Sequence, residues 1–403
     1  MSLDPVGHET SATTEQADVG MRRVGRWRIP FAELRAYTMV IALLGIWMFF
    51  QWKTISDLYP YGLFLHPLNL ANLLKQMAVT GVLAVGMLMV IVARQIDLSV
   101  GSLLGLAGGL AAMAQGWGLV PSLGTAIVIG LVAGALQGGL VAYLNVPAFI
   151  VTLGGLLAWR GVILWASRGE TIPVRIPVFR SLGVSLLAPQ VGWALAAVAI
   201  VALAVSAIRR NRARRKHGLP VSGPVTVAVK IVAPAILIVV FMVVMNAQGG
   251  VPIPVIVMLA VAGAGHFLMQ NTTFGRYLYA IGSNPEAARL SGIDAKRSIL
   301  ATFSLLGALV GIAAILHTAR VGSASPDAGG LMELDAIAAC VIGGTSLMGG
   351  RGKVSGALLG ALVMASLDNG MSLLSVGNAT QYIIKGAVLV GAVAFDMAGR
   401  RPH

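Results

Sequence analysis

The sequence predicts an all-α integral membrane protein that crosses the bilayer many times. Of its 403 residues, 57% are hydrophobic and only 11% are charged, whereas a soluble globular domain carries about 25% charged residues. Many apolar runs are about 20 residues long, which is the length a helix needs to cross the hydrocarbon core. Runs such as 127–144 are too long and too continuously apolar for the strands of an outer-membrane barrel. We therefore expect about ten transmembrane helices, some of them interrupted.

The chain opens with a polar segment, residues 1–30, that contains no apolar core and ends in the basic patch MRRVGRWR. This composition predicts a disordered basic cytoplasmic tail and not a cleavable signal peptide. Residues 31–403 are expected to form one transmembrane domain. An ambiguous run lies at 332–348, and the other candidate spans are 36–52, 70–93, 98–116, 121–144, 148–166, 190–208, 229–247, 252–270, 298–318, 354–372 and 380–398.

The basic residues predict the orientation of the chain in the membrane. The net charge of +14 is clustered beside apolar runs, which fits the positive-inside rule better than nucleic-acid binding. The clusters lie in the tail, in a basic loop near 209–230, in a segment near 275–297 and at the C-terminus. They place both termini in the cytoplasm and require an even number of crossings. Arg168, Arg175 and Arg180 fall on a loop that this topology puts outside, against the trend.

A weak internal repeat is visible in the sequence. VGSLLG (100–105) and VSGALLG (354–360) align at Gly101 with Gly356 and at the following Leu-Leu-Gly. Repeated halves with interrupted helices are common in transporters. Glycine-leucine runs also recur by chance in a chain with 50 glycines, so both explanations stay open.

Asp97 is the first candidate for a functional residue, because it lies between two apolar runs. A carboxylate at membrane depth costs several kcal/mol unless it is paired or hydrated, so it is expected in a protein-lined cavity or at a broken helix. Asp97 and Ser99 also suit the start of a helix, where side-chain oxygens accept from free backbone N–H groups. Other polar candidates for a translocation path or a broken helix are Asn145, Thr152, Thr345, Ser346 and Asn369.

The patterns of common catalytic and metal sites are missing. The glycine-rich stretch 341–353 fails the P-loop pattern, because Leu347 stands at the first glycine position and Val354 follows Lys353. The sequence contains no H-E-x-x-H zinc motif, and the lone Cys340 has no partner for an intrachain disulfide. We therefore expect no catalytic residue, no metal and no cofactor in this chain.

The stretch 284–292 predicts a short polar helix between two apolar runs. Asn284 suits its N-cap, Pro285 its first position, and Gly292 its end. A helix of about two turns is unstable alone in water, so it must dock on another surface. The neighbouring apolar residues include no Trp or Phe to anchor it at the membrane interface. A cytoplasmic protein partner is therefore expected.

Three motifs resemble a known family. Glu286-Ala287-Ala288 followed by Gly292 matches the E-A-A-x-x-x-G loop of ABC importer permeases. Together with IDLSVGSLLGLAG (96–108) and VIGGTSLMGGRGKVSGALLGAL (341–362), it makes residues 65–398 resemble the monosaccharide permeases of the ribose, galactose, arabinose and xylose importers. The basic loop near 209–230 is similar to that of the longer, xylose-type members.

The resemblance implies a transport subunit and not an enzyme. It implies a homodimeric permease in the bacterial inner membrane that imports a monosaccharide, D-xylose or a related pentose. It also implies two partners, an ATP-binding cassette ATPase that holds ATP and magnesium, and a periplasmic sugar-binding protein. The residues implied to couple the permease to the ATPase are Asn284, Pro285, Glu286, Ala287, Ala288, Arg289 and Gly292. The alternative is a proton-coupled secondary sugar transporter that uses Asp97, His266 or His317.

Overall fold

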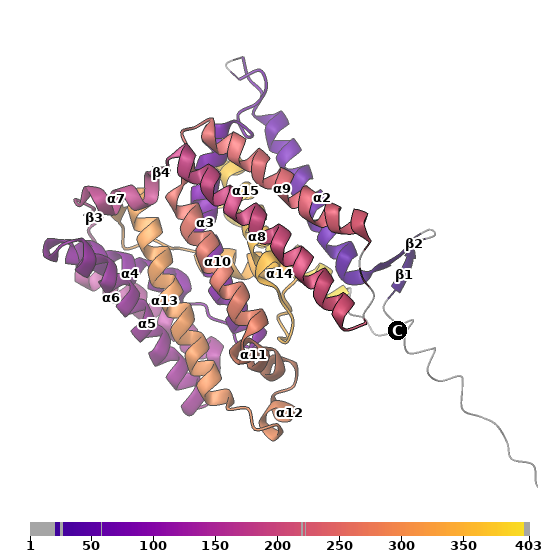
Figure 1. Ribbon diagram of the computed structural model, residues 1–403. Coiled ribbons are helices and arrows are strands. Elements are labelled where there is room, and N and C mark those ends of the chain that lie inside the picture. Colours follow the sequence, from indigo (N-terminus) through magenta and orange to yellow (C-terminus); the bar gives the residue numbers. More distant parts are fainter. Residues whose placement is uncertain (1–20, 25–26, 58, 219–220, 222, 399–403) are drawn as a thin grey trace, which may run out of the picture.

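The computed structural model describes residues 21–24, 27–57, 59–218, 221 and 223–398. These residues form a bundle of helices (Figure 1), eight of which are long and apolar enough to cross a membrane. The eight are α3 (Pro67–Val92), α5 (Leu119–Tyr143), α6 (Ala148–Ser167), α8 (Pro189–Lys216), α9 (Pro224–Asn246), α10 (Ile253–Asn271), α13 (Ala295–Val321) and α15 (Val354–Leu373). Two further long helices, α2 (Phe31–Lys53) and α16 (Asn378–Ala398), lie near the chain termini. The predicted polytopic helical class is confirmed.

Two short strands lie within the segment that the sequence predicts as a basic tail. β1 (Met21–Val24) and β2 (Trp27–Pro30) pair as an antiparallel hairpin, with Val24 opposite Trp27. Residues 1–20, where the rest of the predicted tail lies, are outside the described residues.

The helices α4 (Val100–Met113) and α14 (Met332–Ile342), which lie between long helices of the bundle, are too short to span the bilayer. They have 14 and 11 residues, and a helix of that length is at most about 21 Å long against a hydrocarbon core of about 30 Å. Non-helical backbone precedes each of them, at 93–99 and at 325–331. The interruption expected near Asp97 is therefore present, and the ambiguous run resolves into α14 and the loop that follows it.

α3 and α13 run in opposite directions through the centre of the bundle. α3 begins where its Asn69 bonds Asn369 near the end of α15, and it ends where Val92 bonds Gly350. α13 begins beside α12 (Pro285–Leu290) and ends beside α7 (Pro177–Val184), where Arg320 meets Gly183. We call these two ends of the molecule the α12 end and the α7 end.

The order of elements repeats with inverted direction. α3, α4, α5 and α6 follow one another as a long helix, a short helix after a loop, and two more long helices, and α13, α14, α15 and α16 do the same. This arrangement pairs α4 with α14. The repeat in the sequence had aligned the start of α4 with the start of α15, so a repeat exists but in a different register. A short glycine-leucine match is therefore not enough to show which helices of the two halves correspond.

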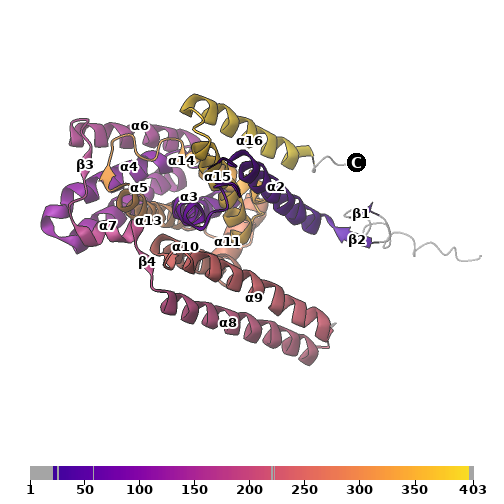
Figure 2. The same ribbon diagram turned by 90° about the horizontal axis from the view of Figure 1, so that it is seen from above.

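Close packing of small residues holds the centre together. A Cβ on Gly130 or Gly134 of α5 would overlap backbone atoms of Gly307 or Phe303 on α13, so these two helices approach to backbone contact, as small residues allow in membranes. α3 is the most enclosed spanning helix, with 83% of its apolar window buried, against 6% for α9. α8 and α9 form a hairpin at the side of the bundle (Figure 2), with their apolar faces exposed.

The remaining elements are short and lie at the ends of the bundle. At the α7 end, β3 (Ile172–Pro173) pairs with β6 (Ser323–Ala324), and β4 (Leu186–Leu187) pairs with β5 (Val251–Pro252). The 3-10 turn η1 (Ala114–Trp117) follows α4. At the α12 end, α11 (Thr273–Ser283) leads directly into α12 (Figure 1).

Candidate functional site

The short polar helix expected at 284–292 is present as α12. The side-chain oxygen of Asn284 accepts hydrogen bonds from the backbone N–H groups of Glu286, at 3.1 Å, and Ala287, at 3.0 Å. Pro285 occupies the first helical position, where its missing N–H costs nothing. The predicted N-cap is therefore confirmed, and it marks the start of a helix of only six residues.

The end of α12 depends on the backbone conformation of Gly292. This residue has φ +80°, which side chains with a Cβ rarely adopt. The next N–H, of Ile293, bonds the carbonyl of Ala288 at 3.1 Å, as in a Schellman motif. A Cβ on Gly292 would meet no atom within 4 Å, so within this chain the glycine serves the turn and not a tight contact.

α12 presents its charged side chains away from the protein. Those of Glu286 and Arg289 are 78% and 76% exposed and lie 4.0 Å apart, whereas Ala288 is buried against the protein. An exposed ion pair of this kind contributes little to folding stability. Both charges are thus free to contact another protein.

α11 anchors α12 to the rest of the bundle. The Tyr279 hydroxyl donates to the carbonyl of Gly352 at 2.8 Å, and burial raises the pKa of that hydroxyl above its ordinary value. A Cβ on Gly282 would overlap both the carbonyl oxygen of Val92 and the backbone nitrogen of Gly350. The last turn of α11 therefore lies in backbone contact with the end of α3 and with the loop 343–353.

The glycine-rich loop 343–353 serves as a packing element. Gly344, Gly349 and Gly350 all have positive φ, and the N–H of Gly350 bonds the carbonyl of Val92 at 2.9 Å. Thr345 and Ser346, both predicted as site candidates, are buried within this loop. The loop joins α14 to α15 and touches both α3 and α11, which agrees with the expectation that its glycines allow close packing.

A polar cluster surrounds the interrupted segment 93–99. Asp97 is 2% exposed, and one of its carboxylate oxygens accepts from both the N–H and the hydroxyl of Ser99, each at 2.7 Å. The Ser99 hydroxyl accepts from the Gln137 side chain at 2.9 Å, and the Thr152 hydroxyl donates to the carbonyl of Ile96 at 3.3 Å. Asp97 thus closes a turn just before α4. Ser99 lies at the N-cap position but makes no side-chain bond to the amides of α4.

The second interrupted segment lies against the first. Arg160 of α6 donates to the carbonyls of Pro326 and Ala328, at 2.5 and 3.2 Å, and so satisfies backbone groups that no helix pairs. A Cβ on Gly101 would overlap the carbonyl of Gly329 and the carboxylate of Glu333. Both breaks therefore meet where α4 and α14 begin.

Three charged side chains connect α14, α15 and α16. The ammonium of Lys385 lies 3.0 Å from Asp335 and 2.9 Å from Asp368. The side chain of Lys385 is 19% exposed, that of Asp335 10% and that of Asp368 30%. Ion pairing lowers the cost of holding charges at this depth, and it ties the short helix α14 to two full-length neighbours.

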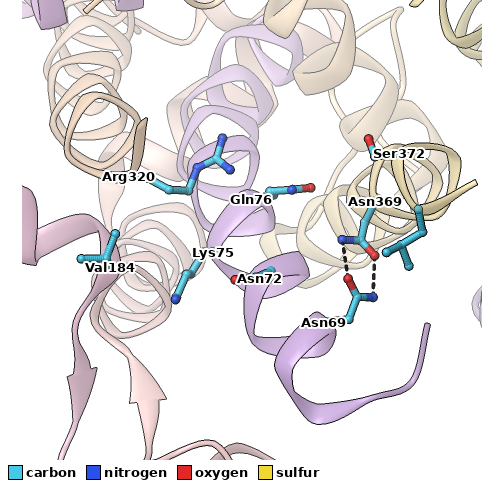
Figure 3. A pocket seen from close by; sticks show the side chains of 9 residues that line it. Asn69, Asn72, Lys75, Gln76, Val184, Arg320, Asn369 and Ser372 are labelled. Atoms are coloured by element: carbon cyan, nitrogen blue, oxygen red, sulfur yellow. Dashed lines mark hydrogen bonds between the residues drawn. The ribbon is translucent and has the colours of Figure 1, made fainter. Parts of the chain in front are cut away.

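A polar pocket opens at the α7 end of the bundle. Asn69 and Asn369 exchange two hydrogen bonds between their side chains, at 2.7 and 3.0 Å, and form one side of the pocket (Figure 3). The cavity has a volume of about 380 Å³. It lies opposite α12, because α3 runs from Asn69 at the pocket to Val92 beside α11.

The seven predicted pathway candidates fall in four separate places. Asp97, Ser99 and Thr152 share the cluster near the first break, Thr345 and Ser346 lie in the loop 343–353, and Asn369 borders the pocket. Asn145 is exposed in the turn between α5 and α6, with φ +54°, so its place is that of a turn residue. Gln137, Arg160 and Tyr279 were not among the residues predicted from the sequence. A polar side chain inside an apolar run was the available signal for the first two.

Comparison with known proteins places the chain in a family. Residues 69–393 match the model described as "Branched-chain amino acid transport system / permease component". The chain belongs to this permease family. It is 43% identical over 371 residues to the xylose transport system permease protein of Escherichia coli strain K12, covering 91% of this chain and 93% of that protein.

Other relatives in the permease family are also sugar permeases. The xylose transport system permease protein of Haemophilus influenzae is 41% identical over 378 residues, which cover 93% of this chain and 99% of that protein. The ribose import permease protein of Escherichia coli strain K12 is 36% identical over 330 residues, which cover 81% of this chain and 85% of that protein. No solved structure matches the chain. The resemblance to sugar permeases is confirmed, and the higher identities agree with the xylose type.

Proposed function

We propose that this permease is the membrane-spanning subunit of an ATP-driven importer of D-xylose or a related pentose. The observation that carries the proposal is the 43% identity to a xylose transport system permease along nearly the whole of both chains. The partners in this proposal are an ATP-binding cassette ATPase with its ATP and magnesium, a periplasmic sugar-binding protein and a second copy of the permease. The compartment is the bacterial inner membrane.

The proposed mechanism starts at α12. Its exposed Glu286 and Arg289 contact the ATPase, so that closure of the ATPase around ATP pushes on α12. Because Gly282 of α11 touches Val92 and Gly350, the push reaches the end of α3 and the loop 343–353 together. The end of α3 leads into the break at 93–99, and the loop 343–353 follows the short helix α14. One movement would therefore act on both interrupted spans, which suits alternating access.

The charge distribution supports the proposed orientation. The exposed basic residues of α8 at 209–216 come after about 20 residues that begin at the α7 end, and Arg276, Arg289, Lys296 and Arg297 lie at or beside α12. The positive-inside rule then puts the α12 end in the cytoplasm, where an ATPase is found. The pocket at the α7 end faces the periplasm, the side from which a binding protein delivers sugar.

A proton-coupled carrier is the less supported alternative. In that alternative, Asp97 carries the proton. Both hydrogen bonds to Asp97 come from Ser99, two residues away, so the carboxylate closes a local turn. The two xylose relatives, at 43% and 41% identity, are permease proteins of transport systems, which agrees with a multi-subunit importer.

Uptake of labelled xylose in cells lacking the gene, and in the same cells with the gene restored, tests the proposal. One arm depletes ATP with arsenate, and the other adds a protonophore to cells kept supplied with ATP. The proposal predicts loss of uptake in the first arm and its survival in the second. Uptake that survives ATP depletion and is abolished by the protonophore would overturn it in favour of the carrier.

A further inference from the structure

We infer that the pocket at the α7 end is a binding site for a monosaccharide on the periplasmic side of the permease. This inference rests on the proposed function, and it adds a location and a set of residues. Side chains from three spanning helices and from α7 meet there (Figure 3). The lining residues are Asn69, Asn72, Lys75, Gln76, Val184, Arg320, Asn369, Ser372 and Leu373.

The position of the pocket suits the arrival of substrate. Asn69 and Val92 are 23 residues apart on the same helix, so the pocket lies about 35 Å along α3 from the contact with α11. That separation is about the thickness of the hydrocarbon core. The pocket and α12 are therefore on opposite sides of the membrane, with the interrupted segments between them.

The lining of the pocket suits a polyhydroxylated ligand. Seven of its nine lining residues carry hydrogen-bonding side chains, and only Val184 and Leu373 are apolar. A sugar hydroxyl both donates and accepts, as carboxamide and hydroxyl side chains do. The volume of about 380 Å³ lies within the range of about 300–1,000 Å³ that is typical of small-molecule sites.

Three of the neutral side chains in the lining have no hydrogen-bond partner within the described protein. Asn69 and Asn369 bond each other, but Asn72, Gln76 and Ser372 make no side-chain hydrogen bond to any other described residue. These three side chains are neutral and lie around the same cavity. Asn72 and Ser372 are exposed and Gln76 is half-buried, so a polar ligand in the pocket can replace the water at these donors and acceptors.

Two cations complete the pocket. Lys75 and Arg320 have no carboxylate partner among the described residues, and no acidic residue lines the cavity. Both side chains only donate hydrogen bonds, so they complement the lone pairs of a ring oxygen or a hydroxyl. Cations without partners also attract anions, but the majority of neutral side chains favours a neutral sugar, and the test separates the two ligands.

The pocket can be tested by thiol protection, because Cys340 is the chain's lone cysteine and is fully buried. Val184→Cys places a thiol at the edge of the pocket and leaves all seven polar side chains intact. Trp117→Cys is the matched control, because Trp117 is 80% exposed at the same end but outside the pocket. Both variants, with the unaltered protein as blank, are placed in lipid nanodiscs and labelled with a maleimide in the presence of xylose, xylonate or sulfate.

The inference predicts that xylose slows labelling of Val184→Cys several-fold and leaves Trp117→Cys unaffected. Adding Asn72→Leu and Gln76→Leu should remove this protection, and Ser372→Ala should weaken it if the double variant does not fold. No protection by xylose, or protection by xylonate and sulfate alone, would overturn the sugar site. Uptake of the unaltered permease under ATP depletion is measured separately, so failure of the pocket is distinguishable from failure of the proposed function.

Discussion

The N–H of Gly350 bonds the carbonyl of Val92 at 2.9 Å. This bond joins the loop 343–353, which follows the second interrupted span, to the end of α3, which directly precedes the break at 93–99. Gly282 lies against both groups. One backbone contact therefore links the segment that carries α12 to both breaks in the membrane helices. In the proposed mechanism, movement of α12 reaches both breaks through this three-way contact.

Gly282→Ala should weaken the contact. The added Cβ would overlap the Val92 carbonyl and the Gly350 nitrogen, and overpacking of this kind costs typically about 1–3 kcal/mol. We expect a lower unfolding midpoint in detergent and reduced ATP-driven uptake. Gly263→Ala in α10 is the control, because a Cβ there would meet no atom within 4 Å. Equal behaviour of the two variants would contradict the contact.

Asn284→Ala should impair transport without removing the protein from the membrane. It leaves the N–H groups of Glu286 and Ala287 without their side-chain acceptor, which typically costs about 1 kcal/mol, a large share for a six-residue helix. Asn284→Asp keeps an acceptor oxygen and should retain most of the uptake. If Asn284→Ala transports as well as Asn284→Asp, the cap does not matter for coupling.

Lys385→Met should destabilise the protein strongly. It leaves Asp335 and Asp368 close together without their cation, and removing one partner from a buried ion pair costs about 3–5 kcal/mol, or somewhat less here because Asp368 is 30% exposed. The triple variant Lys385→Met, Asp335→Asn, Asp368→Asn should recover much of the lost stability. Thermal unfolding in detergent measures both. A triple variant no more stable than the single one would show that the three charges do not act as a unit.

Asp97→Asn should retain ATP-driven uptake, because an amide oxygen can still accept from the N–H and hydroxyl of Ser99. Asp97→Leu offers no acceptor and should lose much of the uptake. Initial rates of xylose entry compare the two variants. Complete loss of uptake in Asp97→Asn at a normal membrane level would favour a role in proton transfer, since the amide cannot carry a proton at this position.

Local features of the site were predictable from sequence, but its spatial relations were not. Asn284, Pro285 and Gly292 each have a local role at a helix end, and local rules predict such roles. The break near Asp97 followed from the cost of a carboxylate at membrane depth. By contrast, Gly282 and Gly350 are 68 residues apart, and their contact depends on how α11 packs. No local rule indicates that packing.

The polar residues inside spans were the hardest to assign. Lys385 and Asp335 are 50 residues apart, and each alone had several possible partners. Asn69 and Arg320 lay outside the set of candidates, because polar residues near the ends of predicted spans are ordinary in membrane proteins. Only the convergence of α3, α13 and α15 at the α7 end brings them into one cavity.

The most direct measurement is the uptake of labelled xylose by Glu286→Lys, with Glu170→Lys as the control. Glu170 is an exposed carboxylate just after α6, at the opposite end of the molecule, so the control makes the same charge change away from α12. At equal membrane levels, we predict that Glu286→Lys loses ATP-driven uptake and Glu170→Lys keeps it. Normal uptake by Glu286→Lys would contradict the assignment of α12 as the helix that couples the permease to its ATPase.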